Sequence, residues 1–250
     1  MSILFDLSKY FYTDIELLDI SKYEIDDFFE ISGILDLEKF YKLIRLTCSF
    51  NDITKIINIP ASLEILICEN CKINDINLIN TNIKILKCSN NSIMNCDNLP
   101  ESLVELYCNW NNIKSLDNLP IGLKKLYCSN NKITLLNNLP ITLEILNCSC
   151  NLITNLDNLP NSLINLNCSS NLIINLDNLP NMLKKLSCKF IKRIKKLDNL
   201  PEKIFEINCN FTNISNILIS NKLCKIYWIN IPKLIEFNLQ SKGYIIKKVY

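Results

Sequence analysis

The sequence has 250 residues and a net charge of +2, with 27 basic and 25 acidic side chains and no histidine. A charge balance this close to neutral gives no general attraction to nucleic acid or to an anionic membrane. Without histidine, and with only three glycines, the chain lacks the usual base for a serine or cysteine nucleophile, a phosphate-cradling loop and a dinucleotide fingerprint, so we expect neither an enzyme nor a cofactor.

The N-terminal residues 1–42 do not fit the pattern of the rest of the chain. Two capping-box patterns, Thr13-x-x-Glu16 and Ser21-x-x-Glu24, stand ahead of apolar residues, and residues 36–43 have the pattern of a third, short helix. We therefore predict an N-terminal helical cap that covers the open end of the core. The alternative is that these helices form an adaptor module that docks on a ubiquitin ligase.

From residue 43 the sequence repeats about every twenty residues, as a comparison of 143–162 with 163–182 shows. Apolar residues stand at positions 1, 4, 6 and 11 of each repeat, asparagine at position 9, and a Leu-Pro pair near the end. The alternation around positions 4 and 6 predicts a short strand with one buried face. The proline favours an extended or polyproline return rather than a helix. We predict a solenoid of about nine repeats over 43–222, then a last strand and C-terminal cap over 223–250.

Nine of the thirteen cysteines occupy position 6 and form one column of the predicted core. Cysteine behaves there as a small apolar residue, and neighbouring strands hold the Cβ atoms about 4.8 Å apart, beyond the usual disulfide spacing. We therefore expect free, buried thiols and a protein of a reducing compartment. Cys68-x-x-Cys71 is half of a zinc motif without a second pair, so no metal site is expected. The cysteines of the column are Cys48, Cys68, Cys88, Cys108, Cys128, Cys148, Cys168, Cys188 and Cys209.

We expect the protein to be intracellular and to lie in the cytoplasm. The cytoplasm of an infected host cell is one such location. The segment Met1–Asp6 is interrupted by an acid and has no basic leader, which argues against a signal peptide. No run of about 18 apolar residues occurs, so we expect no membrane span.

Aromatic residues of repeats four and five and isoleucines of repeats two and three gather at the outward-facing positions 3, 5, 7 and 8. Tyr107 and Tyr127 are neighbours at position 5, and Trp110 stands at position 8. Exposed tyrosine and tryptophan in a cluster are typical of protein-binding hot spots. The alternative is an ordinary strand surface, since tyrosine and isoleucine favour strands in any case. The predicted protein-binding patch consists of Ile65, Ile67, Ile85, Lys87, Tyr107, Trp110 and Tyr127.

A run of basic residues without an intervening acid marks a repeat that is one residue longer than the others. The simplest interpretation is a solvated bulge on the convex side. Contact with an acidic partner, nucleic acid or anionic lipid is the alternative. Because Phe190 is the only aromatic residue in the run, nucleic acid is not the partner that we expect. The basic set consists of Lys184, Lys185, Lys189, Lys192, Arg193, Lys195 and Lys196.

The pattern L-x-x-L-x-(L/C)-x-x-N-x-(L/I), read over about ten repeats, resembles that of the leucine-rich-repeat superfamily. The short period and the L-x-x-L-x-x-L-P-x-x-L run resemble the twenty-residue class of bacterial effectors of the YopM and IpaH type. In that class a first proline stands where this chain has an acid such as Asp157. The cysteine at position 6 and the bias to Asn, Ile and Lys are similar to leucine-rich-repeat proteins of giant DNA viruses such as the mimiviruses.

The resemblance implies an α/β repeat solenoid, a right-handed superhelix with a concave parallel β-sheet, and a protein-binding role. We expect a non-enzymatic module that binds a protein partner on the concave sheet. Two alternatives stay open: a substrate-recognition adaptor of a ubiquitin ligase, with the N-terminal helices as its dock, and a structural solenoid without a specific partner.

Overall fold

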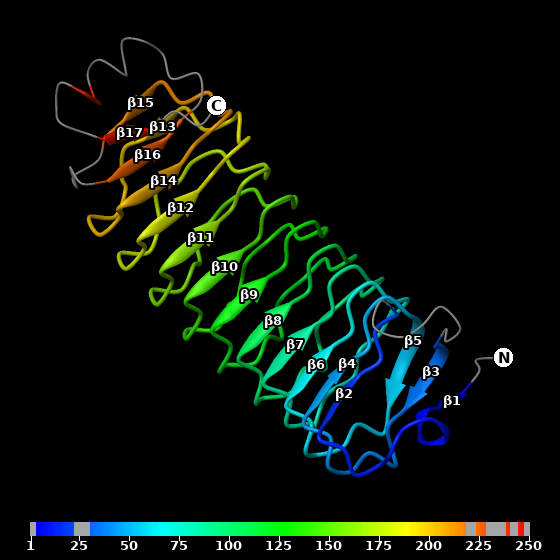
Figure 1. Cartoon of the computed structure of the whole chain (residues 1–250). Helices are drawn as coiled ribbons and strands as arrows, with labels where there is room; N and C mark the ends of the chain where they lie inside the picture. The colour runs from blue at the N-terminus through cyan, green and yellow to red at the C-terminus, as the bar shows by residue number, and fades with distance from the viewer. Residues whose placement is uncertain (1–3, 23–30, 219–223, 229–238, 241–244, 248–250) are drawn as a thin grey trace. The chain divides into compact units, whose positions relative to one another are not determined.

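The structure of the chain, a computed structural model, describes residues 4–22, 31–218, 224–228, 239–240 and 245–247. The chain divides into two compact parts, here called the N-terminal half, Met1–Tyr127, and the C-terminal half, Cys128–Tyr250. Both halves are built from stacked turns of about twenty residues, each of which contributes one short strand to a parallel sheet (Figure 1).

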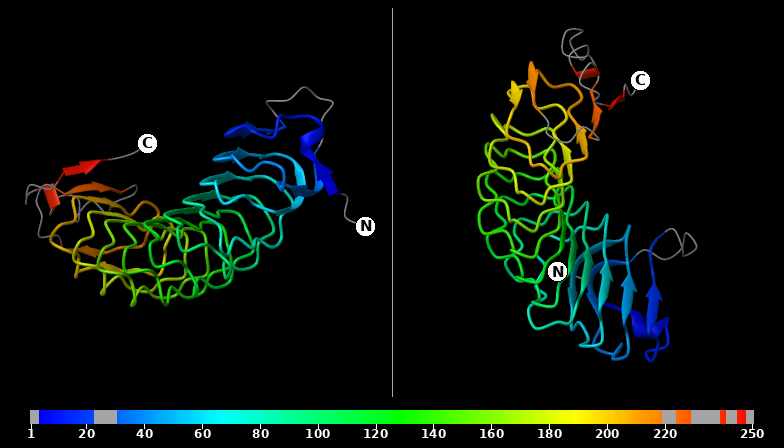
Figure 2. Two further views of the ribbon diagram at one scale, coloured as in Figure 1. Left: turned by 90° about the horizontal axis from the view of Figure 1, so that it is seen from below. Right: turned by 90° about the vertical axis from the view of Figure 1, so that its left-hand side faces the viewer.

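The main sheet of the N-terminal half consists of strands paired in parallel, and each of them has a buried residue at its centre. The right-hand view of Figure 2 shows the blue and cyan strands of this half side by side. The buried centre is the leucine of position 4, as the alternating pattern predicts. The strands are β2 (Leu17–Asp19), β4 (Arg45–Thr47), β6 (Ile65–Ile67), β7 (Ile85–Lys87), β8 (Glu105–Tyr107) and β9 (Lys125–Tyr127).

The C-terminal half repeats this arrangement, with parallel pairing in the same register. Its main sheet contains β10 (Ile145–Asn147), β11 (Asn165–Asn167), β12 (Lys185–Ser187), β14 (Glu206–Asn208), β16 (Lys225–Tyr227) and β17 (Ile245–Lys247). A second, small sheet pairs β13 (Lys196–Leu197) with β15 (Asn216–Ile217). Most of the predicted C-terminal cap lies outside the described residues.

Asparagine at position 9 holds neighbouring turns together through hydrogen bonds to the backbone. The Nδ2 atom of Asn91 donates to the carbonyl oxygens of Cys68, at 2.8 Å, and Cys88, at 3.1 Å. Its Oδ1 atom accepts from the N–H of Ile73 at 2.9 Å. One side chain thus satisfies backbone groups that lack a partner where the chain leaves the sheet. Where Cys71 replaces the asparagine, its thiol makes weak contacts with the carbonyls of Cys48 at 3.4 Å and Glu69 at 3.6 Å.

The return of each turn is closed by the proline near its end. The N–H of Leu103 donates to the carbonyl of Pro100 at 3.1 Å, and the N–H of Leu123 does the same to Pro120. Proline cannot donate but its carbonyl can accept, so it starts a tight turn that delivers the chain to the next strand. Between residues 58 and 183 the returning segments are bends and turns rather than helices. No helix among the described residues is long and apolar enough to cross a membrane.

The predicted N-terminal helical cap is wrong. In the described part of residues 1–42 the chain forms strands, one 3-10 turn, η1 (Leu7–Lys9), and loops. Strand β2 directly follows the first capping-box pattern and pairs with β4. Strands β1 (Leu4–Asp6), β3 (Ser32–Asp36) and β5 (Asp52–Ile57) form a separate parallel sheet.

The physical reason lies in tertiary pairing and in local turns. The carbonyl of Glu16 accepts hydrogen bonds from the N–H groups of Ile44 and Arg45, so it joins the sheet ladder instead of a helix. Leu37, Phe40 and Leu43 are buried, and successive i to i+3 hydrogen bonds connect them as turns. Their spacing of three imitates one face of a helix. Glu24, of the second capping-box pattern, lies outside the described residues.

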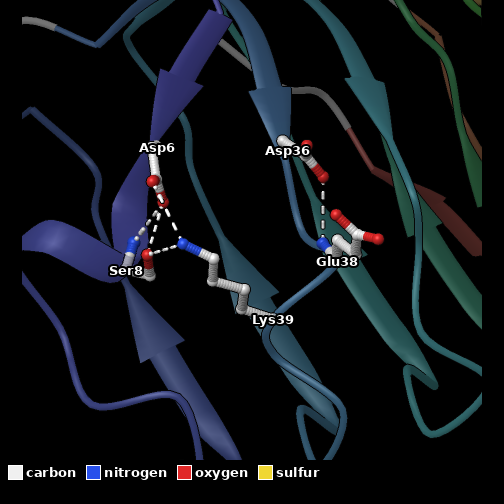
Figure 3. A network of polar contacts seen from close by, with 5 residues as sticks. All are labelled: Asp6, Ser8, Asp36, Glu38 and Lys39. Carbon is white, nitrogen blue, oxygen red and sulfur yellow. Dashed lines mark hydrogen bonds and ion pairs between the residues drawn. The ribbon is translucent and has the colours of Figure 1, made fainter.

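A polar network occupies the place of the expected cap. The Nζ atom of Lys39 lies 3.3 Å from Oδ2 of Asp6 and donates to Oγ of Ser8 at 2.8 Å (Figure 3). Asp36 accepts from the backbone N–H of Glu38 at 2.9 Å. The first contacts connect the end of β1 to the loop after β3, and the last is the aspartate-capped turn that begins this loop.

Candidate protein-binding surface

Six of the seven predicted patch residues lie on one face of the main sheet of the N-terminal half. Strand register places them in two adjacent columns, which correspond to positions 3 and 5 of the repeat. All six are partly exposed, while the residue between the two columns is buried in every strand. Position 3 contributes Ile65 and Ile85, followed by Glu105 and Lys125, and position 5 contributes Ile67, Lys87, Tyr107 and Tyr127.

Tyr107 and Tyr127 stack directly on each other. Their ring centroids are 4.6 Å apart and their planes differ by 4°. This spacing follows from the backbone, because paired strands hold equivalent residues about 4.8 Å apart. The sheet therefore arranges the two rings before any partner arrives.

Charged groups fix the orientation of the Tyr107 ring. The Nζ atom of Lys87 lies 5.1 Å from the ring centroid, within cation–π range. The Tyr107 hydroxyl donates to Oε2 of Glu105 at 2.9 Å. The other oxygen of Glu105 accepts from Nζ of Lys125 at 2.8 Å.

These contacts shift two pKa values in opposite directions. Burial, assisted by the hydrogen bond to the Glu105 carboxylate and its charge, raises the pKa of Tyr107 to about 12. The hydrogen bond from Lys125 lowers the pKa of Glu105, against a smaller effect of burial. At neutral pH the surface thus presents a neutral phenol beside a paired carboxylate.

Trp110, the seventh residue, lies on the turn after β8 and is 59% exposed. Its φ angle is 55°, in the left-handed region. Asn70, Asn90 and Asn130 occupy the same position in other repeats with nearly the same φ. Asparagine enters this region readily, whereas a bulky side chain does so at a cost of roughly 1–2 kcal/mol. The sequence pattern places Trp110 at position 8 but does not reveal this backbone strain.

The structure distributes the basic set around one turn of the C-terminal half instead of gathering it on one face. Lys184 directly precedes β12, which begins at Lys185, and Lys195 directly precedes β13 of the second sheet, which begins at Lys196. Lys185 forms an ion pair of 3.2 Å with Glu206. The remaining members lie on the segment between the two strands: Lys189, Lys192 and Arg193.

The cysteine column is buried, as predicted, and its thiols are free. Burial raises the pKa of Cys48, Cys68 and Cys168 well above the usual range and that of Cys148 to about 12. Such thiols stay protonated and unreactive at neutral pH. Cys150 is exposed. The described residues contain no group of three or more His, Cys, Asp or Glu side chains that could hold a metal ion.

Neither a family model nor a curated protein matches the sequence. Among solved structures, the leucine-rich-repeat domain of a Shigella effector is 31% identical, over 69% of this chain and 80% of that domain, with a TM-score of 0.50. YopM from Yersinia enterocolitica WA-314 is 26% identical over 81% of this chain, with a TM-score of 0.64. This chain spans about half the length of the YopM structure, 51%.

A third similarity concerns the fold alone. The leucine-rich-repeat part of FLRT2, from an octameric complex with Latrophilin 3 and Unc5D, matches 86% of this chain and 82% of its own length. Its TM-score is 0.68 and its identity is 17%.

Proposed function

The chain belongs to the leucine-rich-repeat family, and from that premise we propose that it binds another protein on the main sheet face of its N-terminal half. The observation that carries this proposal is the stacked, partly exposed pair Tyr107 and Tyr127, in which Lys87 and Glu105 hold the Tyr107 ring. Stacked, oriented rings on a rigid sheet offer a partner apolar area that is already ordered.

Binding becomes weaker when flexible side chains must become ordered at the interface, because their conformational entropy is lost. Here the stack orders both phenol rings, and the ammonium group of Lys87 and the Glu105 hydrogen bond further hold the ring of Tyr107. Tyrosine and tryptophan are also enriched among residues that dominate binding energy. Ile65 and Ile85 continue the surface along the neighbouring strands and extend its apolar area.

The relatives support the general role. FLRT2 contributes its leucine-rich repeats to a complex with two other proteins. The Shigella protein whose domain is 31% identical to this chain over the matched part is an effector. We propose binding, not catalysis, for this chain as well, within the reducing cytoplasm that the column of free thiols favours.

The adaptor alternative depends on N-terminal helices as the dock, and the described part of residues 1–42 contains strands β1, β2 and β3 instead. That alternative therefore loses the structural basis on which the sequence suggested it. The remaining alternative, a solenoid without a specific partner, is an outcome of the experiment below.

The test is quantitative affinity capture from cell lysate with matched variants. One variant carries Tyr107→Ala and Tyr127→Ala, and a second carries Trp110→Asn, which the left-handed backbone accepts. The control carries Asn147→Ala and Asn167→Ala, the same strand position in the C-terminal half. Circular dichroism and thermal unfolding verify the fold of each variant.

We expect a protein that the wild type and the control retain and that both patch variants lose. A partner retained equally by all four proteins would place the binding site elsewhere and overturn the proposal. Failure to enrich any protein over an unrelated resin-bound control would favour the structural solenoid.

A further inference from the structure

A second aromatic pair lies in the C-terminal half. Phe190 and Phe211 occupy position 8 of successive repeats, with φ angles of 60° and 58°. Their rings stack with centroids 4.6 Å apart and planes that differ by 7°. The two side chains are nevertheless 50% and 43% exposed.

The fold itself does not require these rings. Position 8 adopts the left-handed conformation in other repeats with asparagine or serine, as Asn130 and Ser170 show. A bulky residue is less stable there than asparagine, and half-exposed rings recover only part of their burial free energy. Two phenylalanines in succession at such a position indicate a use other than stability.

The surroundings of Phe190 are strongly basic. Lys189 directly precedes Phe190, and Lys192 and Arg193 follow on an exposed turn. The Nδ2 atom of Asn213 donates to the carbonyl of Lys192 at 3.1 Å, which connects this turn to the repeat of Phe211. No aspartate or glutamate occurs between residues 178 and 197 or between 207 and 218. The positive charge beside the rings therefore comes from the Phe190 repeat, and the segment 207–218 around Phe211 carries no charge of either sign.

The composition of the surface distinguishes between two kinds of anionic partner. Lysine is depleted at protein–protein interfaces, where arginine predominates among the basic residues. A surface that combines lysines with exposed aromatic rings is typical of sites for single-stranded nucleic acid, in which phosphates meet the ammonium groups and bases stack on the rings. A duplex would hide its base faces from the rings.

We propose that the surface formed by Lys189, Phe190, Lys192, Arg193 and Phe211 binds single-stranded nucleic acid. Bases stack on the phenylalanine pair, and Lys189, Lys192 and Arg193 contact the phosphates. The sequence alone argued against this partner because Phe190 stood alone among the lysines. Its companion lies 21 residues later, and only the stacking of the repeats brings the two together.

The test measures fluorescence anisotropy of a labelled oligouridylate of about twelve nucleotides, within the range bound by single-strand sites. An abasic oligonucleotide of equal length carries the same phosphates without bases. The double variant Phe190→Asn, Phe211→Asn removes the rings with a residue that the backbone favours. Phe50→Asn, at the same position of the N-terminal half, is the matched control.

We expect the double Phe variant to bind oligouridylate about tenfold more weakly or worse, while Phe50→Asn binds as the wild type does. The abasic oligonucleotide should bind the wild type as weakly as oligouridylate binds the double variant. Lys192→Gln together with Arg193→Gln should lower the slope of log affinity against log salt by about 0.7 for each phosphate that the variant no longer neutralises.

Equal affinity for the base-bearing and abasic strands, or an unchanged affinity of the double variant, would overturn the proposal and leave only charge attraction. Tighter binding of an acidic, phenylalanine-containing peptide than of oligouridylate would overturn it in favour of a protein partner. The variant Tyr107→Ala, Tyr127→Ala should bind the oligonucleotide normally, so this proposal and the protein-binding proposal fail separately. Thermal unfolding should show that the double Phe variant is at least as stable as the wild type.

Discussion

Tyr107 and Glu105, two residues apart on strand β8, are joined by a hydrogen bond of 2.9 Å on the outward face of the sheet. Side chains at i and i+2 share one face of a strand, so the contact is a direct product of the strand conformation. Lys125 on the neighbouring strand donates to the same carboxylate. The Glu105 carboxylate therefore connects the ring of Tyr107 to the ammonium group of Lys125.

The alkaline titration of the protein should reveal Tyr107. Its pKa is raised to about 12, because burial and Glu105 both disfavour the phenolate. A raised pKa in the folded state stabilises the fold below the unfolded value of about 10, and this contribution is lost as pH rises from about 10 to 12. We expect tyrosinate absorbance to show one late-titrating tyrosine that disappears in Tyr107→Phe. A wild-type titration curve that Tyr107→Phe leaves unchanged above pH 11 would contradict this assignment.

The variant Glu105→Gln should show how much the ionised carboxylate of Glu105 contributes to stability. The pKa of Glu105 is lowered in the fold, so its contribution to stability is present above the unfolded value near 4.5 and is lost as pH falls through the folded value. At neutral pH the variant should lose about 0.5–1 kcal/mol of unfolding free energy, a usual size for a partly exposed ion pair. Urea unfolding at pH 7 and pH 3 measures this. The difference between wild type and variant should shrink at pH 3, and an equal difference at both values would argue against an ionic contribution.

Replacing Trp110 by asparagine should leave the fold as stable as before or stabilise it by about 1 kcal/mol, since asparagine enters the left-handed region readily. The reverse substitution at the equivalent position of another repeat, Asn90→Trp, should destabilise the fold by a similar amount. Urea midpoints of the two variants give the comparison. A clear loss of stability in Trp110→Asn would mean that the indole packs against the fold more than its 59% exposure indicates.

Substitution of a buried asparagine at position 9 should destabilise the fold far more. Asn151 is buried, donates to the carbonyls of Cys128 and Cys148, and accepts from the N–H of Ile133 at 3.0 Å. Asn151→Ala should cost roughly 3 kcal/mol, because each buried backbone group left without a partner costs about 1–3 kcal/mol. Thermal or urea unfolding measures the loss. Asn158→Ala is the control, since Asn158 is exposed and bonds only another side chain, and a change of about 0.5 kcal/mol or less is expected there.

Thiol labelling should separate the cysteines by their place in the fold. In the native protein an aromatic disulfide reagent should react quickly with the exposed Cys150, and Cys150→Ser should remove this fast phase. The position-6 thiols should react only on the time scale of unfolding, since burial keeps them protonated and covered. All thirteen should react in denaturant. Rapid native labelling of Cys148 or Cys168 would show that the core column opens.

The repeat period predicted most of the main sheet correctly, because one face of each strand must be buried and leucine at position 4 marks it in every turn. The N-terminal strands were missed for a physical reason. Leu17–Asp19 carries neither the cysteine nor the asparagine of the later repeats, and its capping-box neighbours favour a helix locally. Pairing with β4 overrides this local preference.

For the patch residues, too, the sequence predicted some features of the site and not others. Column membership of Tyr107 and Tyr127 follows from spacing alone, so their proximity was predictable. Their near-parallel stack, the Glu105 hydrogen bond and the strained turn of Trp110 depend on side-chain and backbone angles that no spacing rule encodes. The pair of Phe190 and Phe211 was hidden because an added residue shifts the period between them to 21.

The constant register between successive strands also determines how the number of repeats can change. Strands β10, β11 and β12 pair with identical offsets, and their turns exchange the same backbone bonds. Excision of residues 163–182 would therefore bring β12 against β10 with the same ladder, and duplication of that segment would insert a further equivalent turn. Recombination between near-identical segments can lengthen or shorten this protein in steps of one repeat, and each product inherits a ready-made fold.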